Sequence, residues 1–68
     1  MTATTLLCLL RLPAVRARVG LGRSAIYAGV TAGTFPAPVK LGERCVAWPE
    51  HEIQAWIQAR IAEREARS

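Results

Sequence analysis

The chain has few of the residue types that build catalytic and metal sites. Its 68 residues include no Asp, no Asn and one histidine, His51, and the serines are only Ser24 and Ser68. A nucleophile, a base and a group that orients the base cannot be assembled from this set, so we expect no enzyme. Cys8, Cys45 and His51 are the soft metal ligands, and no pair of them has zinc-finger spacing, so we expect no metal and no cofactor.

The sequence also lacks a long apolar run and a disulfide framework. No stretch approaches the ~20 apolar residues that a membrane-spanning helix requires. The apolar run 6–10 is too short for a signal peptide, lacks a basic leader and meets Arg11. Two cysteines without a secretory context predict reduced thiols. We therefore expect a soluble cytoplasmic protein with no membrane partner.

Aromatic residues make up only 6% of the chain and charged residues 21%, whereas 51% of the residues are hydrophobic. This composition predicts a folded chain rather than a disordered one. At this length a core supplies only ~3–5 kcal/mol, so a deep substrate cavity is not expected. The few large side chains must form the core, chiefly Phe35, Trp48 and Trp56. Their periodicity places them on core faces and not on a surface for base stacking.

Negative charge is scarce in the first two thirds of the chain. Residues 1–48 contain six Lys and Arg residues against one acid, Glu43, for a net charge of +5. Residues 49–68 contain three Arg against four Glu, for a net charge of −1. A basic excess in one region indicates a polyanionic partner, but a solvated basic surface explains the charge equally well.

Residues 19–38 predict a short helix that follows a tight turn. A Gly-Leu-Gly sequence favours the turn, and Ile26 and Val30 lie one helical turn apart in segment 23–32. Gly33 suits the left-handed residue that ends a helix, and two prolines just beyond it prevent the helix from resuming.

A first helix precedes this turn. Pro13 suits its first position, where no backbone N–H is needed, and Gly20 suits its end. Arg16 and Arg18 on this helix are open to solvent or to a phosphate. Residues 13–32 therefore predict a helix-turn-helix, and its second helix suits insertion into a DNA groove.

From residue 38 the apolar pattern changes from helical to alternating. Segment 38–48 predicts a β-hairpin with a tight turn at Gly42 and with Val46 and Trp48 on its core face. Segment 50–64 predicts a third helix, because two Glu residues in its first turn complement the helix dipole and apolar residues form a stripe on one face. The stripe consists of Ile53, Trp56, Ile57 and Ile61.

This order of elements predicts a mainly α fold with a small β-hairpin, a winged helix-turn-helix. Residues 38–48 form the wing, and the third helix supports the helix-turn-helix. We expect a flexible N-terminal tail over residues 1–8, a single domain over residues 9–64 and a frayed C-terminus over residues 65–68.

Several motifs lie along this predicted domain. They are L-R-L-P at 10–13, V-G-L-G-R-S-A-I-Y at 19–27, G-T-F-P-A-P-V-K-L-G at 33–42, R-C-V-A-W at 44–48 and E-I-Q-A-W-I at 52–57. Together they resemble the AlpA family of small phage and prophage regulators, which are related to MerR-type winged-helix and excisionase proteins. The resemblance covers about residues 9–61, and the F-P-x-P-V-K-L-G run joined to R-x-V-x-W is its most specific part.

The resemblance implies DNA contacts from three elements. The start of the recognition helix supplies Arg23, Ser24, Ala25 and Tyr27. The wing supplies Lys40 and Arg44, and the first helix supplies Arg18, beside which Arg16 is a further candidate. Arg23 contacts either a guanine edge or a phosphate, and Tyr27 contacts DNA or packs at the core rim. Lys40 and Arg44 contact DNA or are solvated.

Four positions depart from the family pattern. Gly22 stands where a Ser cap is usual, Ala25 stands where Thr is common, and Ala28-Gly29 replaces an Arg followed by a large apolar residue. The last change removes one phosphate contact and thins the core behind the second helix. We therefore expect weaker intrinsic affinity, or reliance on a partner or on cooperative binding.

We expect a sequence-specific double-stranded DNA-binding transcriptional regulator of a phage or mobile element, associated with the nucleoid. Helix 23–32 enters the major groove and wing 38–48 lies on the adjacent backbone or minor groove. Two alternatives stay open: an excisionase that bends DNA at an attachment site, and a protein–protein adaptor that does not read DNA. One module reads few base pairs, so specificity predicts a homodimer, cooperative assembly, or a partner such as an integrase or another regulator.

Overall fold

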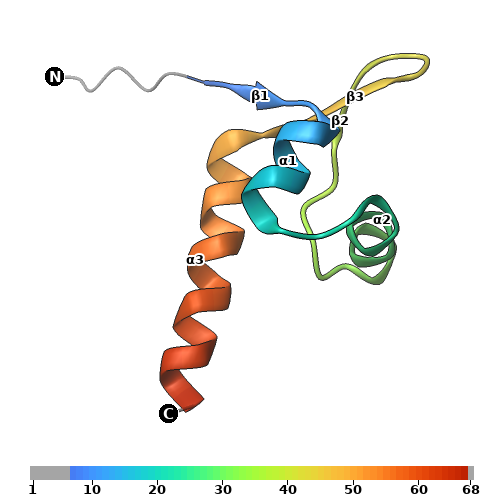
Figure 1. Ribbon diagram of the computed structural model, residues 1–68. Coiled ribbons are helices and arrows are strands. Elements are labelled where there is room, and N and C mark those ends of the chain that lie inside the picture. Colours follow the sequence, from blue (N-terminus) through green and yellow to red (C-terminus); the bar gives the residue numbers. More distant parts are fainter. Residues whose placement is uncertain (1–6, 68) are drawn as a thin grey trace, which may run out of the picture.

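The computed structural model describes residues 7–67, which form three helices and a three-stranded antiparallel sheet (Figure 1). In chain order the elements are β1 (Leu9–Leu10), α1 (Leu12–Val19), α2 (Arg23–Ala32), β2 (Val39–Gly42), β3 (Cys45–Pro49) and α3 (Glu50–Arg67). The strand order is β1-β3-β2, so β3 is central. Helix-turn-helix, hairpin and supporting helix follow one another as in a winged helix-turn-helix, which confirms the predicted fold class.

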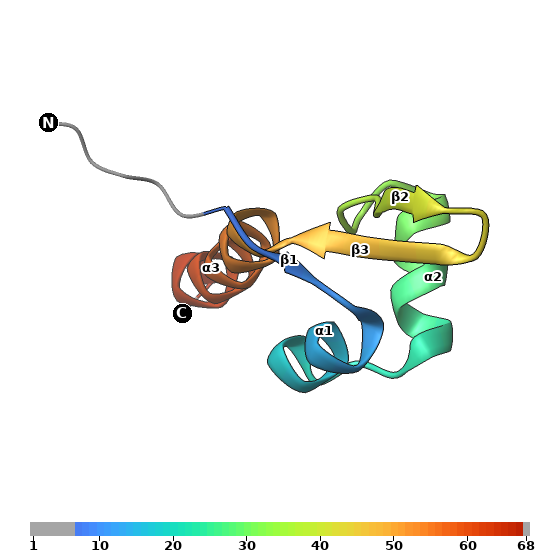
Figure 2. The same cartoon turned by 90° about the horizontal axis from the view of Figure 1, so that it is seen from above.

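The three helices lie on one face of the sheet (Figures 1 and 2). Helix α2 lies at the end of β3 that carries the hairpin turn, and α3 continues from the other end of β3. Helix α1 lies between them and packs against both. The sheet therefore separates α2 and α3 along its length while α1 joins them.

The core forms where β3 meets the helices. Trp48 of β3 is fully buried, and each helix is anchored by one fully buried aliphatic side chain: Val15 in α1, Ile26 in α2 and Ile53 in α3. The indole N–H of Trp48 donates to the carbonyl oxygen of Pro36 (2.8 Å), which satisfies the one polar atom of this ring. All three helices therefore contribute to the same hydrophobic cluster as Trp48.

The segment between α2 and β2 packs against both α2 and α3. Phe35 is buried with its ring edge-on to Trp56 of α3 (centroids 4.9 Å apart), and the Trp56 N–H donates to the Thr34 carbonyl oxygen (2.8 Å). Phe35 also approaches α2 closely at Gly29, where an added Cβ would lie 2.9 Å from the Phe35 Cβ. Gly29 therefore admits Phe35 to the core, and the expectation that the glycine at residue 29 thins the core is corrected, because Phe35 fills the space beside it.

Left-handed glycines end α1 and α2; the sequence predicted both helix ends and the left-handed conformation of Gly33. Gly20 has φ 75° and donates its N–H to the Arg16 carbonyl, and Gly33 has φ 83° and donates to the Val30 carbonyl. Any other L-residue at these positions would be strained. At these two residues the chain changes direction, once before α2 and once after it.

The hairpin and the start of α1 differ from the predictions. Helix α1 begins one residue before Pro13. The hairpin turn consists of residues 43–44 and not of Gly42, which pairs with Cys45. An irregularity in β2 between Lys40 and Gly42 shifts the register, and this places the glycine inside the strand rather than in the turn.

Strand β1 lies in the apolar run 6–10. In the structure it pairs with β3, with Leu10 opposite Trp48, because both side chains face the core. The Cys8 carbonyl oxygen accepts the Glu50 N–H (2.8 Å), so Cys8 belongs to the fold and not to the predicted tail. Residues 1–6 of that tail lie outside the described residues.

Helix α3 is longer than predicted. It begins after Pro49, which closes β3, and continues to Arg67, past the predicted end at residue 64. Residues 65–67, predicted to fray, are helical, and Ser68 lies outside the described residues. None of the helices in residues 7–67 has the length and apolar character needed to cross a membrane.

Candidate nucleic-acid interface

Helix α2 presents an uncapped N-terminus to solvent. Gly22 occupies the N-cap position with an extended backbone (φ −81°, ψ 172°), and no side chain caps the helix. The first turn contains no acidic residue, and Arg23, Ser24 and Ala25 are exposed. The free backbone N–H groups and the positive end of the helix dipole therefore favour an anion at this end.

Aromatic rings connect the start of α2 to the core. The guanidinium carbon of Arg23 lies 5.5 Å from the centroid of the Tyr27 ring. The Tyr27 ring meets Trp48 edge-on, with centroids 6.0 Å apart and planes at 64°. Tyr27 is half-buried, so its ring packs at the core rim while it holds the Arg23 side chain at the surface.

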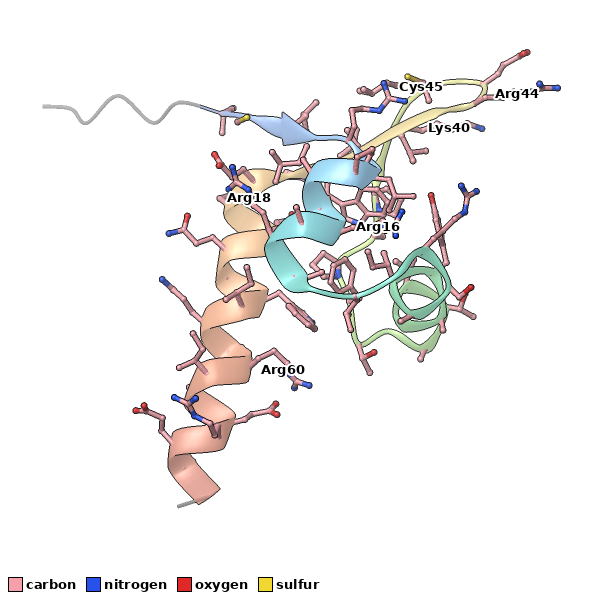
Figure 3. The ribbon with its side chains drawn as sticks, viewed as in Figure 1. Arg16, Arg18, Lys40, Arg44, Cys45 and Arg60 are labelled. Atoms are coloured by element: carbon pink, nitrogen blue, oxygen red, sulfur yellow. The ribbon has the colours of Figure 1, made fainter. Side chains whose placement is uncertain are left out.

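The hairpin places two cations at the same end of the molecule as α2 (Figure 3). Lys40 is opposite Val46, a residue that packs against the core, so Lys40 lies on the helix-facing side of the sheet. Arg44 lies in the turn, and both cations are exposed. The turn, the helix-facing side of β2 and α2 together form one basic end of the molecule.

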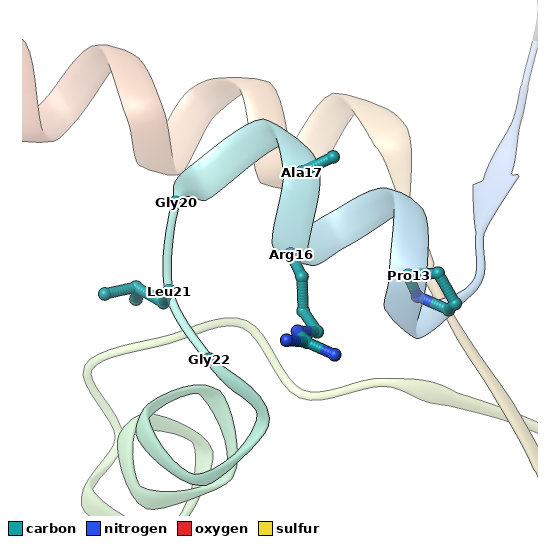
Figure 4. Close-up of a pocket in the computed structure, with 6 residues that line it drawn as sticks. All are labelled: Pro13, Arg16, Ala17, Gly20, Leu21 and Gly22. Carbon is teal, nitrogen blue, oxygen red and sulfur yellow. The ribbon is translucent and has the colours of Figure 1, made fainter.

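Arg16 reaches a groove between α1 and the glycine turn (Figure 4). The groove has a volume of about 490 Å³, with residues 20–22 as its second wall and Pro13 and Ala17 beside Arg16. Arg16 is exposed and forms no ion pair within the part of the chain that the structure describes. An anion that entered this groove would meet an uncompensated guanidinium group.

Arg18 is separated from the other predicted contacts. Its Nη1 donates to Oε2 of Glu50 (2.6 Å), which ties α1 to the start of α3. Two residues along a helix correspond to a rotation of about 200°, so Arg16 and Arg18 leave opposite sides of α1 (Figure 3). Of the predicted cations, Arg18 is the one that the structure engages in an ion pair.

Sequence reasoning assigned no role to Arg11, which occupies the N-cap position of α1. Its neighbour Leu10 pairs with Trp48, whose ring contacts Tyr27, so the backbone of Arg11 adjoins the basic end. Arg11 is exposed and has no acidic partner among residues 7–67. The sequence feature that could have identified Arg11 as a candidate contact is its place in residues 1–42, which contain no acid.

The cations and the acids lie in different parts of the fold. Among residues 7–66, whose side chains the structure describes, five cations form no ion pair: Arg11, Arg16, Arg23, Lys40 and Arg44. Four of the five acids are on α3, at the other end of β3, and Glu43 is the single acid in the hairpin. The described residues contain no group of three or more His, Cys or acidic side chains that could hold a metal ion. The arrangement suits contacts with the phosphates of a polyanion.

A helix-turn-helix followed by a hairpin whose turn lies beside the second helix defines a winged helix-turn-helix protein. Residues 8–61 match the family model described as prophage CP4-57 regulatory protein (AlpA). The chain therefore belongs to the AlpA family, as its motifs indicate.

Two relatives support this assignment. The chain is 46% identical over 56 residues to the uncharacterized protein ORF88 of Enterobacteria phage P4, a match that covers 82% of this chain and 64% of the phage protein. It is 38% identical over 58 residues to the DNA-binding transcriptional activator AlpA of Escherichia coli (strain K12), covering 76% of this chain and 83% of that protein. The chain thus spans less than two thirds of the length of the phage relative and most of the length of the bacterial one.

Proposed function

We propose that this chain is a sequence-specific double-stranded DNA-binding transcriptional regulator of a phage or mobile element. In this proposal α2 enters the major groove and the hairpin lies over the adjacent backbone or minor groove. The observation that carries it is the distribution of charge among the described residues: Arg16 of α1, Arg23 of α2 and the two hairpin cations form no ion pair there, whereas four of the five acids lie on α3. The relation to an Escherichia coli protein named as a DNA-binding activator supports it.

Phosphate contacts supply most of the affinity in this mechanism. Arg16 donates from its groove, Lys40 and Arg44 donate from the hairpin, and the backbone N–H groups at the start of α2 donate between them. Donors on three elements fix the position and direction of α2 on the duplex. Each neutralised phosphate releases counterions, so binding weakens steeply as the salt concentration rises.

Arg23 is the residue that reads sequence in this proposal. The guanidinium group of Arg23 lies over the Tyr27 ring, which holds it at the exposed start of α2, from where it donates to a guanine edge or to an adjacent phosphate. Ser24 and Ala25 are exposed in the same helical turn and face the groove beside it. A small side chain at both positions lets the first turn of α2 approach the bases closely.

Binding to fluorescent duplex DNA tests the proposal. Preferred sequences are first selected from a random duplex pool, and the dissociation constant is then measured at several salt concentrations for the wild type, Arg23→Ala and Arg64→Ala. Arg64 is an exposed arginine near the end of α3, so its removal changes the net charge equally at a distant place. We expect Arg23→Ala to weaken binding by about tenfold or more and Arg64→Ala to have little effect.

The same measurements separate the roles of Arg23. A base contact predicts a relaxed sequence preference, whereas a phosphate contact predicts a salt dependence that is lower by about one counterion. Absence of duplex binding, or equal losses for both variants, would contradict the proposal and favour a protein adaptor. Strong bending at an attachment site without any effect on a promoter would favour the excisionase instead.

A further inference from the structure

Helix α2 turns one face directly away from the core. Ile26 is its fully buried residue, and each residue along an α-helix rotates the side-chain direction by about 100°. Ser24, Ala28 and Thr31 therefore lie within about 40° of the direction opposite Ile26, and all three residues are exposed. These three residues form the outer face of α2, and Thr31 is its largest side chain.

This outer face carries no charge along its whole length. No charged residue occurs between Arg23 and Lys40, whereas the exposed surface of α3 carries several, among them Arg60 and Arg64. A helix face that remains in water normally carries charged or strongly polar side chains. The contrast with α3 indicates that the outer face of α2 is covered when the protein acts, at the end of the molecule where the hairpin cations lie (Figure 3).

Arg23 lies on a flank of α2 and not on this face. Its direction is about 60° from that of Ile26, and its guanidinium carbon lies over the Tyr27 ring, which in turn meets Trp48 of the sheet. The flank is thus nearer to the sheet. When a helix lies along the major groove, residues spaced i, i+4 and i+7 point to successive base edges and the flanks approach the backbones. Ser24, Ala28 and Thr31 have that spacing.

The side chains of the outer face limit the bases that it reads. Arg and Lys read guanine, Asn and Gln read adenine, and Asp and Glu read cytosine. The outer face contains none of these side chains. It offers the methyl groups of Ala28 and Thr31, and thymine is the base that presents a methyl group in the major groove, where Ala and Thr contact it. The chemistry of the face therefore favours thymine.

We infer that Thr31 is a specificity-determining residue whose methyl group contacts the methyl group of a thymine, an inference that rests on the proposed function. The small side chains of Ser24 and Ala28 let α2 approach the bases closely enough for the short Thr31 side chain to reach one. Seven residues of α-helix span about 10.5 Å and successive bases are about 3.4 Å apart. The thymine therefore lies about three base pairs from the base nearest Ser24.

Replacement of thymine by uracil in the DNA tests the inference, because it removes the methyl group and leaves base pairing unchanged. Each thymine of a duplex selected from the random pool is replaced in turn, and fluorescence anisotropy gives the dissociation constant. We expect one position at which uracil weakens wild-type binding about fourfold, the effect of losing one buried methyl group. Uracil outside the contacted bases is the control and should change nothing.

Two variants of Thr31 show whether this residue makes the contact. Thr31→Ser removes the methyl group and keeps the hydroxyl, whereas Thr31→Val keeps a methyl group and removes the hydroxyl. Ser, Thr and Val have similar helix propensities, and circular dichroism checks that each variant folds. Thr31→Ser should bind the thymine and uracil duplexes equally, and Thr31→Val should retain the difference of about fourfold between them.

The outcomes that contradict the inference differ from those that contradict the proposed function. A selected site in which uracil has no effect at any thymine would overturn the inference. So would an effect of uracil that Thr31→Ser retains, or one that Thr31→Val abolishes and Thr31→Ser keeps, since the hydroxyl would then read the base. In these cases the wild type still binds the duplex and the proposed function stands, whereas absence of duplex binding would overturn both.

A larger side chain tests the close approach of α2 to the bases. Ala28→Leu enlarges the outer face, and Ala62→Leu makes the same change on the exposed surface of α3. Leucine forms helices nearly as well as alanine, so both variants should fold. We expect Ala28→Leu to weaken binding to the selected duplex about tenfold or more through a clash with the bases, and Ala62→Leu to leave it unchanged. Unchanged binding by Ala28→Leu would overturn the inference, because the outer face would then not lie against the bases.

Discussion

Helix α2 has ten residues, no side-chain cap, no acid in its first turn and no base in its last turn. Helix α3 has eighteen residues, begins with Glu50 and Glu52 in its first turn, and carries an ion pair between Arg60 and Glu63 one turn apart. An isolated helix as short as α2 is marginal in water, and Gly29 in its interior costs a further ~1 kcal/mol relative to Ala. Local interactions thus support α3 and give little support to α2.

The difference shows what a helix that is proposed to read DNA gives up. Acids at the start of α2 would stabilise it through the helix dipole, but they would also occupy the end that is proposed to meet phosphate. The sequence leaves that end basic and uncapped, and anchors the helix from behind through Ile26, Tyr27 and the close approach of Phe35 to Gly29. The stability of α2 therefore comes from the core, and the following predictions test this contrast.

Trp48→Ala should have the largest effect on stability. Trp48 is fully buried, supports Tyr27 and donates to Pro36, and truncation of a buried Trp costs about 3–5 kcal/mol. That is the whole stability expected from a core of this size, so the variant should be mostly unfolded at 25 °C. Urea unfolding followed by far-ultraviolet circular dichroism measures the loss.

Trp56→Ala is the comparison on α3. The Trp56 ring is only half-buried, so we expect a smaller loss and a variant that still folds. Equal losses for the two tryptophan variants would show that α2 does not depend on the core more than α3 does. Trp48 was predicted as a core residue from alternation alone, whereas its hydrogen bond to Pro36 was not predictable.

Gly29→Ala should destabilise the domain although alanine is the better helix former. The added Cβ would lie 2.9 Å from the Phe35 Cβ, which is close to the backbone and cannot turn away. Overpacking costs about 1–3 kcal/mol and helix propensity returns ~1 kcal/mol, so we expect a net loss of up to ~2 kcal/mol. The midpoint of urea unfolding measures it.

Ala62→Gly on the exposed surface of α3 is the matched reverse change. Here no neighbour opposes a methyl group, so removing it should cost ~1 kcal/mol through helix propensity alone. A stabilised Gly29→Ala variant would mean that Phe35 can retreat from α2 without cost. A methyl group added at residue 29 of α2 is thus expected to lower the stability, whereas the methyl group already present at residue 62 of α3 is expected to raise it. This difference in sign expresses the contrast between the two helices.

Local signals made much of the fold predictable. The limits of α2 and the left-handed Gly20 and Gly33 follow from residues within one turn of each corner. Strand β1 could not be predicted, because its partner β3 lies almost forty residues away and its two residues carry no periodicity. The hairpin turn was misplaced by one residue because an irregularity in β2 places Gly42 inside the strand.

The candidate interface was predictable to a similar degree. Residue type and position pointed to Arg23 and the two hairpin cations, and the fold brings α2, which begins at Arg23, to the hairpin end of the sheet. The pairing of Arg18 with Glu50 joins residues 32 positions apart, so the sequence carried no sign of it. Arg11 needed the β1–β3 pairing to bring it near the basic end. Contacts between residues far apart in the sequence were thus the ones that local reasoning missed.

Helix α1 lies between α2 and α3 and carries one arginine toward each, so Arg16→Ala and Arg18→Ala compare the two sides with the same charge change. Arg16 has no acidic partner in the described part of the chain, and its loss should lower the salt dependence of DNA binding by about one counterion and weaken binding several-fold.

Arg18 is engaged with Glu50 at the surface, and such exposed pairs contribute about 0–1 kcal/mol. Its loss should lower stability slightly and leave the salt dependence unchanged, because Glu50 remains favourably placed at the start of α3. Equal changes in salt dependence for both variants would mean that Arg18 exchanges Glu50 for a phosphate on binding, and the division between a DNA-facing and a structural side of α1 would then be wrong.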